Sequence, residues 1–183
     1  MARYFPPWLR EAWIQCEGAG PHRVADPGGY PYLWMKAGEP SLAEASQSRG
    51  AKQVRSYRLT WLRTFHAPMI VRVEQPADGQ MTVIAKRLSG RAGYYPGLVD
   101  ATMQRPLTRD EQVRFNQALT AANHLNLAPA DCRLGVDGSQ WVFEANDQGT
   151  YRYVKRWTPE AGAVREFGEV LLGFTGWKLG PVY

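Results

Sequence analysis

Apolar and polar residues alternate with a period of two along the middle of the chain. The stretches 56–65, 69–75 and 80–88 all show this pattern. Such alternation is typical of a strand that buries one face. Asp78 and Gly79 lie between the second and third stretches, and glycine accepts the positive φ that tight hairpin turns need. The pattern therefore predicts three strands, the last two joined as a hairpin.

A helical period follows further along. Thr108 and Glu111 form an S/T-x-x-E capping box, and Phe115 and Leu119 recur at helical spacing behind it. This predicts a helix over 108–125.

The C-terminal third predicts two more strands and a second helix. Residues 140–145 and 150–157 flank a short polar loop, and Thr158 followed by Pro159 is a suitable start for the last helix.

Taken together, the elements predict a single α+β domain. We expect a mostly antiparallel sheet of about five strands with two main helices packed on it over residues 56–183. Residues 1–55 are rich in aromatic residues, Pro and Gly, and predict an irregular N-terminal arm. Residues 89–106 predict a second Gly/Pro-rich loop. The length of 183 residues suits one domain.

Basic residues are concentrated in one part of the chain. The formal net charge is +5 and the pI is about 9.4. Residues 51–100 hold eight basic and three acidic side chains, whereas the rest of the chain is balanced. A local positive field attracts acidic proteins, nucleic acids or anionic ligands. The basic residues are Lys52, Arg55, Arg58, Arg63, Arg72, Lys86, Arg87 and Arg91.

Cys16 and Cys132 are the two cysteines, and their spacing fits neither a zinc site nor a CxxC redox pair. They would form a disulfide only in an oxidising compartment. The sequence as written opens on prolines and charges instead of the apolar run of a secretory signal, which favours a cytoplasmic location. It has no apolar run long enough to span a membrane, so no membrane partner is expected.

One segment carries a resemblance. Trp141, Glu144, Gly149, Tyr151, Arg156, Trp157 and Pro159 lie in WVFEANDQGTYRYVKRWTP, a pattern that resembles W-x-x-E…G-x-Y-x-x-x-x-R-W-x-P in small uncharacterised bacterial α+β proteins. The resemblance implies a bacterial origin and a single α+β domain, and it carries no activity or site residue.

Catalytic and metal-binding patterns are missing from the sequence. The three histidines form no HExxH or other ligand cluster, and there is no GxSxG or phosphate-binding glycine motif. We therefore expect no catalytic residue, no metal and no cofactor. One constellation stays open as a ligand or enzyme site, because Glu144 and Tyr151 are expected to face each other across two strands, near Arg156.

The function predicted from these observations is noncatalytic binding of another macromolecule. The expected contact residues are arginines, a lysine and tyrosines on a sheet face and its loops, because arginine and tyrosine are common interface anchors. They are Arg58, Arg63, Arg72, Lys86, Arg91, Tyr94 and Tyr95.

An immunity-type protein that neutralises a bacterial toxin is one concrete form of this prediction, and its partner would be a toxin or effector that is neutral or acidic where it binds. The alternatives are the small enzyme or ligand-binding domain around Glu144, and a nucleic-acid-binding protein that uses the basic 52–91 region. Tyr57 and Trp61 are predicted to point away from Arg58, which weakens a base-stacking surface.

Overall fold

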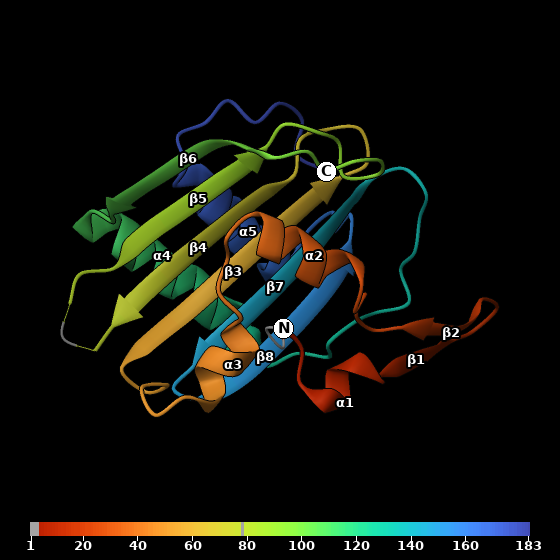
Figure 1. Ribbon diagram of the computed structural model, residues 1–183, viewed down its shortest axis with the longest axis horizontal. Coiled ribbons are helices and arrows are strands. Elements are labelled where there is room, and N and C mark those ends of the chain that lie inside the picture. The colour runs from red at the N-terminus through yellow and green to blue at the C-terminus, as the bar shows by residue number, and fades with distance from the viewer. Residues whose placement is uncertain (1–3, 78) are drawn as a thin grey trace.

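The computed structural model describes residues 4–77 and 79–183. A six-stranded antiparallel sheet with strand order β6-β5-β4-β3-β7-β8 forms its centre (Figure 1). A separate hairpin pairs β1 with β2. The strands are β1 (Trp13–Cys16), β2 (Gly20–Arg23), β3 (Val54–Arg63), β4 (Met69–Pro76), β5 (Thr82–Leu88), β6 (Val99–Pro106), β7 (Ser139–Asp147) and β8 (Thr150–Trp157).

Helices cover both faces of the sheet. Figure 1 shows α4 and α5 behind it and α2 and α3 in front of it, so the fold has three layers. None of the described helices is long and apolar enough to cross a bilayer. The helices are α1 (Pro7–Arg10), α2 (Gly29–Lys36), α3 (Leu42–Gln47), α4 (Arg109–Ala121), the short 3₁₀ helix η1 (Asn123–Leu125) and α5 (Ala163–Gly173).

The predicted α+β class is confirmed, but the predicted element count is wrong. The described residues form eight strands in two sheets and five α-helices, not about five strands and two main helices. The N-terminal arm is not irregular, because it holds three helices and a hairpin. The predicted loop 89–106 contains β6, whose weakly apolar sequence VDATMQRP forms a strand because β5 pairs with it.

The local helix signals had mixed outcomes. The capping box is confirmed, since the Thr108 side chain accepts from the Glu111 N–H and the Glu111 carboxylate accepts from the Thr108 N–H. Thr158 does not cap the last helix. Its side chain instead accepts from the Ser139 N–H, 2.9 Å away, and α5 begins only at Ala163.

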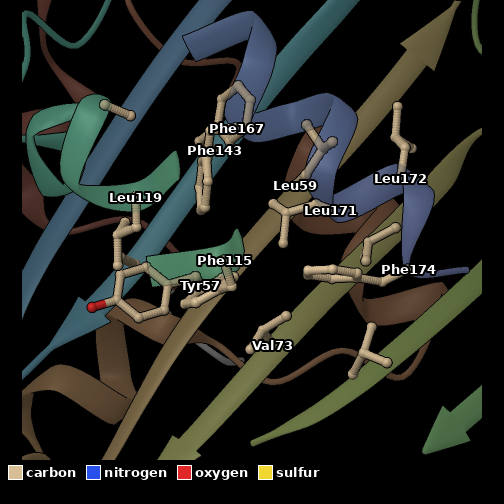
Figure 2. Close-up of a cluster of buried hydrophobic side chains, with 14 of the residues drawn as sticks. Tyr57, Leu59, Val73, Phe115, Leu119, Phe143, Phe167, Leu171, Leu172 and Phe174 are labelled. Carbon is tan, nitrogen blue, oxygen red and sulfur yellow. The ribbon is translucent and has the colours of Figure 1, made fainter. Parts of the chain in front are cut away.

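The core lies between the sheet and the pair α4 and α5. Tyr57, Leu59 and Trp61, the odd-numbered apolar side chains of β3, lie in this core. Phe115 and Phe167 of the two helices pack in the same cluster as Tyr57 and Leu59 (Figure 2). This confirms the period-two prediction for β3. Gly168 lets α5 approach the sheet, because a Cβ there would lie 2.2 Å from Trp141.

The N-terminal layer builds a second core on the opposite face. Phe5 and Trp34 are 2% exposed or less, and their rings meet edge-on with centroids 5.4 Å apart. Val142 of β7 and Ile70 of β4 lie in the same cluster. The arm is therefore packed as a layer of the domain and buries a sheet face that would otherwise meet water.

Cys16 at the end of β1 forms a disulfide with Cys132, 116 residues further along the chain. The bond ties the N-terminal hairpin to the segment that leads into β7. A cross-link over so long a loop restricts the unfolded chain strongly.

We expect the Cys16→Ser/Cys132→Ser variant to lose about 2–5 kcal/mol of unfolding free energy, because its unfolded state regains the entropy of the open loop. Urea unfolding of the oxidised wild type and of the variant measures the difference. Added reductant should lower the stability of the wild type alone. Equal stability of the oxidised wild type and the variant would contradict the prediction.

Candidate functional site

The sheet face under the N-terminal layer carries an unusual density of charge. Four charged side chains lie on it, namely Arg58 of β3, Arg72 of β4, Lys86 of β5 and Glu144 of β7. Alternate residues of a strand point to opposite faces, and the register of the four strands places these residues on the same face. Arg58 and Glu144 are 1% and 0% exposed. Buried charges of this kind need partners, since an unpaired one is very costly in the interior.

Arg58 and Glu144 lie opposite each other on neighbouring strands. The Arg58 guanidinium donates twice to Glu144 Oε2, with Nε at 2.9 Å, and stacks over the Trp34 ring, 4.4 Å from its centroid. Tyr151 donates its hydroxyl to Glu144 Oε1 at 2.8 Å. Both oxygens of the Glu144 carboxylate are therefore paired.

Glu39 brings a second carboxylate to this face from the loop between α2 and α3. Its Oε2 accepts from Arg72 Nε at 2.9 Å, its Oε1 lies 2.8 Å from Lys86 Nζ, and Arg58 Nη1 lies 3.6 Å from Oε2. The same loop supplies backbone carbonyls, because Arg58 Nη1 donates to the oxygen of Pro40 and Lys86 Nζ to that of Ala37. We call Glu39, Arg58, Arg72, Lys86, Glu144 and Tyr151 the buried charge cluster.

The pKa values in the cluster follow from burial and from these partners. Burial alone would raise the pKa of Glu39, but the nearby Arg72, Arg58 and Lys86 outweigh it and hold that pKa below its ordinary value. Complete burial raises the pKa of Glu144, against the opposing attraction of Arg58. Burial and the neighbouring Glu144 carboxylate raise the pKa of Tyr151 well above its usual range.

Two of the three residues predicted for a possible ligand site lie together in the structure. Glu144 and Tyr151 do come together, although Glu144 pairs in register with Tyr153, because the two-residue turn Gln148–Gly149 joins Asp147 to Thr150. Both turn residues have positive φ, as this type of hairpin turn requires. Tyr151 therefore reaches Glu144 along a diagonal.

Arg156 does not join them. It pairs in register with Trp141, a residue of the opposite face, and donates to the carbonyl of Ala128 at 3.0 Å. The cation beside Glu144 is Arg58 instead, from a strand 86 residues earlier.

Four of the seven predicted contact residues are not available at the surface. Arg58, Arg72 and Lys86 belong to the buried charge cluster. Arg63, 4% exposed, lies over the Trp61 ring, and its Nη1 donates to the carbonyls of Leu179 and Pro181. The basic sheet face that the sequence predicted as a contact surface is covered, because the N-terminal layer lies over Arg58, Arg72 and Lys86.

The remaining three predicted contact residues lie together in one exposed loop. Arg91, Tyr94 and Tyr95 belong to the connection between β5 and β6, and the two tyrosines are 69% and 62% exposed. Tyr94 borders a cleft of about 500 Å³. Its other lining residues are Tyr30, Leu62, Thr64, Phe65, Ala92, Gly93, Val136, Asp137, Gln140 and Trp157.

The loop is held in place by its backbone. Its two arms pair with each other, with the Gly90 N–H donating to the Pro96 carbonyl and the Arg91 N–H to that of Tyr95. Gly93 donates to the Thr64 carbonyl, and a Cβ on Gly93 would lie only 2.9 Å from that oxygen. An ordered loop loses little conformational entropy when a partner binds.

Aromatic and aliphatic groups dominate the chemistry of the cleft. Phe65 and Tyr94 lie with ring centroids 6.4 Å apart, and Val136 beside them is 88% exposed. Asp137 provides one carboxylate. The Trp157 ring lies against the backbone of Gly135. We call this surface, formed by the lining residues Phe65, Tyr94, Val136, Asp137 and Trp157 together with Tyr95, which follows Tyr94 in the loop, the aromatic cleft.

Sequence reasoning missed Glu39 in the cluster and most of the cleft. Glu39 precedes Pro40 in a stretch without hydrophobic periodicity, so no pattern placed it in an element of the fold. The only sequence signal for its role was that it is an acidic residue in the N-terminal arm, outside the basic segment. Phe65 and Val136 sit in loops, where an apolar side chain has no pattern to reveal its exposure.

No protein-family model matches the chain, and a comparison with curated proteins finds no match. Among the described residues, no three His, Cys, Asp or Glu side chains group as metal ligands would. The interpretation of the site therefore rests on its geometry.

We expect Glu39→Gln to cost about 3–5 kcal/mol of unfolding free energy, because it leaves buried cations short of one counter-charge. Urea unfolding measures the loss. Glu11→Gln is the control, since Glu11 is an exposed acid of the same arm. Equal effects of the two substitutions would contradict a central role for Glu39.

The lowered pKa of Glu39 also predicts how the free energy of unfolding changes with pH. A carboxyl whose pKa is lower in the folded state stabilises the fold above its unfolded pKa, and this contribution disappears as the pH falls through the folded pKa. The ordinary pKa of a glutamate side chain is 4.5. Wild type should therefore lose more stability than Glu39→Gln as the pH falls below that value. Free energies of unfolding measured across this range test it, and parallel profiles would count against it.

Proposed function

We propose that this protein is a noncatalytic binding module that recognises another protein through the aromatic cleft and the neighbouring Arg91. The observation that carries the proposal is the exposure of Phe65, Tyr94 and Val136 around one cleft, at 45%, 69% and 88%, with Tyr95 next to Tyr94 in the loop at 62%. Large apolar side chains gathered at one exposed place are typical of interaction sites.

The arrangement of ionisable groups supports binding over turnover. Arg58, Glu144 and Tyr151 converge beneath the N-terminal layer, with Glu144 fully buried. A substrate would reach them only if Trp34 and the Glu39 loop moved away. The accessible aromatic cleft, by contrast, offers one carboxylate and mostly apolar walls.

Burial also weakens the nucleic-acid alternative. Of the eight cations in the basic segment, Arg58, Arg63 and Arg72 are buried and Lys86 is bound to Glu39. Two of the others are paired with carboxylates, Arg55 with Asp147 and Arg87 with Asp100. Little of the local charge surplus remains to contact phosphates.

An immunity-type protein that neutralises a toxin is the more specific form of the proposal. The net charge of +5 favours a partner surface that is neutral or acidic. The cytoplasmic location expected from the sequence stays a prediction, and the paired Cys16 and Cys132 favour an oxidising compartment instead.

The test begins with chemical cross-linking of the full oxidised chain to its partner in the native host, followed by mass spectrometry and reconstitution of the purified pair. We expect Tyr94→Ala and Tyr95→Ala to weaken binding by about tenfold or more each, because truncating an aromatic anchor typically costs over 1 kcal/mol. Tyr32→Ala is the matched control, since Tyr32 is an exposed tyrosine of the N-terminal layer.

If the two loop variants bind the reconstituted partner as tightly as wild type does, the cleft is not the binding surface. If the partner is a toxin, the wild-type complex should lose the toxic activity, and Tyr94→Ala should restore it in part at limiting concentrations. Turnover of a small molecule by the purified chain would contradict the noncatalytic assignment.

A further inference from the structure

Four aromatic rings and one carboxylate line the cleft of about 500 Å³. The rings come from separate parts of the chain, namely Tyr30 of α2, Phe65 after β3, Tyr94 between β5 and β6, and Trp157 at the end of β8. The carboxylate is that of Asp137, and among the described residues that line the cleft none is a lysine, an arginine or a histidine. The cleft is therefore locally negative, although the chain as a whole carries a net charge of +5.

Two glycines place Asp137 beside the Trp157 ring. Gly135 and Gly138 both lie against the indole, where an added Cβ would come within 2.1 Å and 3.0 Å of ring atoms. Val136 and Asp137, the two residues between these glycines, line the cleft next to that ring. Asp137 is exposed, and none of the basic side chains that the structure describes forms an ion pair with its carboxylate. This charge is therefore available to a ligand.

Thr64 connects the two loops that carry these groups. Its N–H donates to the Gly138 carbonyl at 3.0 Å, and its hydroxyl accepts from the Gly138 N–H at 3.3 Å. Its own carbonyl accepts from the Gly93 N–H at 3.0 Å. Phe65 follows Thr64 directly, and its ring centroid lies 6.4 Å from that of Tyr94. The backbone that carries the rings and the carboxylate is thus held in place, which lowers the conformational entropy lost when a ligand binds.

We infer that the cleft receives an arginine side chain of the partner protein. The inference rests on the proposed function, because it names the chemical group that the partner inserts. The faces of aromatic rings attract cations, and a carboxylate beside them adds a full negative charge. A guanidinium suits this combination better than an ammonium does, because it stacks on aromatic rings, binds a carboxylate with two hydrogen bonds and is less strongly hydrated.

Arg91 belongs to the same loop as Tyr94, but it does not line the cleft. Burial and the nearby charges of Arg63 and Arg91 lower the pKa of His66, so Arg91 lies close to that ring. His66 Nδ1 lies 2.8 Å from the Tyr183 hydroxyl, and neither of these residues lines the cleft. The positive and the negative group therefore occupy separate places on this surface. A partner whose surface is neutral or acidic overall needs to present only one arginine to the cleft.

N-acetyl-arginine methylamide and its uncharged isostere N-acetyl-citrulline methylamide test the inference on the full oxidised chain without the partner. Nuclear magnetic resonance follows the backbone amides of residues 92–94 and 136–138. We expect the arginine compound to shift these amides and to bind about tenfold more tightly than the citrulline compound. Asp137→Asn should remove most of this difference. Equal binding of the two compounds, or no saturable shift of these amides up to about 100 mM of the arginine compound, would overturn the inference.

The reconstituted pair provides the second measurement. Asp137→Asn should weaken partner binding by about tenfold or more, because the complex removes its carboxylate and the paired cation from water. Asp110→Asn is the matched control, since Asp110 is an exposed aspartate of α4, and thermal melts verify that both variants fold. If Tyr94→Ala weakens the complex and Asp137→Asn does not, the inferred arginine is wrong and the proposed function stands. If neither substitution weakens it, the proposed function fails as well.

Discussion

The carboxylate of Glu39 is the counter-charge for three cations that the central sheet carries on one face. Without it, Lys86 would lose its carboxylate partner, Arg58 would keep only Glu144 and Arg72 only Glu74. The apolar N-terminal layer would then lie over cations that are short of one counter-charge. The rest of the three-layer arrangement depends on this contact. Trp34 packs over Arg58, and its indole N–H donates to Thr60 of the same strand. An apolar layer thus seals a polar face.

Because the N-terminal layer covers this sheet face, the face is not available as a contact surface. The charged groups of the buried charge cluster are paired with one another inside the fold, so they are not accessible to another molecule. The connection between β5 and β6 stays exposed, and it is held by its own backbone pairing and by the contact of Gly93 with Thr64. In the proposed function, binding therefore uses the ordered aromatic loop and not the charged sheet face. The disulfide between Cys16 and Cys132 also helps to keep the charged sheet face covered, because it attaches the start of the N-terminal layer to the domain.

Sequence patterns recovered the elements whose stability is decided locally or by one buried face. The capping box at Thr108 involves atoms three residues apart, and the alternation in β3 reports directly which side chains enter the core. The patterns failed for β6 and for the N-terminal elements. Met103 and its neighbours are only half-buried at an edge, and short helices such as α1 and α3 form because the sheet beneath them completes their packing.

The sequence by itself determined the α+β class, the hairpin of β4 and β5, the helix α4 and the buried face of β3, because each depends on neighbouring residues or on a regular period. It also indicated that Glu144 and Tyr151 would meet, since one short turn joins their strands. Only the tertiary structure decided that Arg58, not Arg156, pairs with Glu144, that Glu39 closes the basic face, and that Arg91, Tyr94 and Tyr95 stay exposed. These outcomes depend on which distant segment covers which face, and the energy of such a contact is set by burial and charge pairing that no local pattern records.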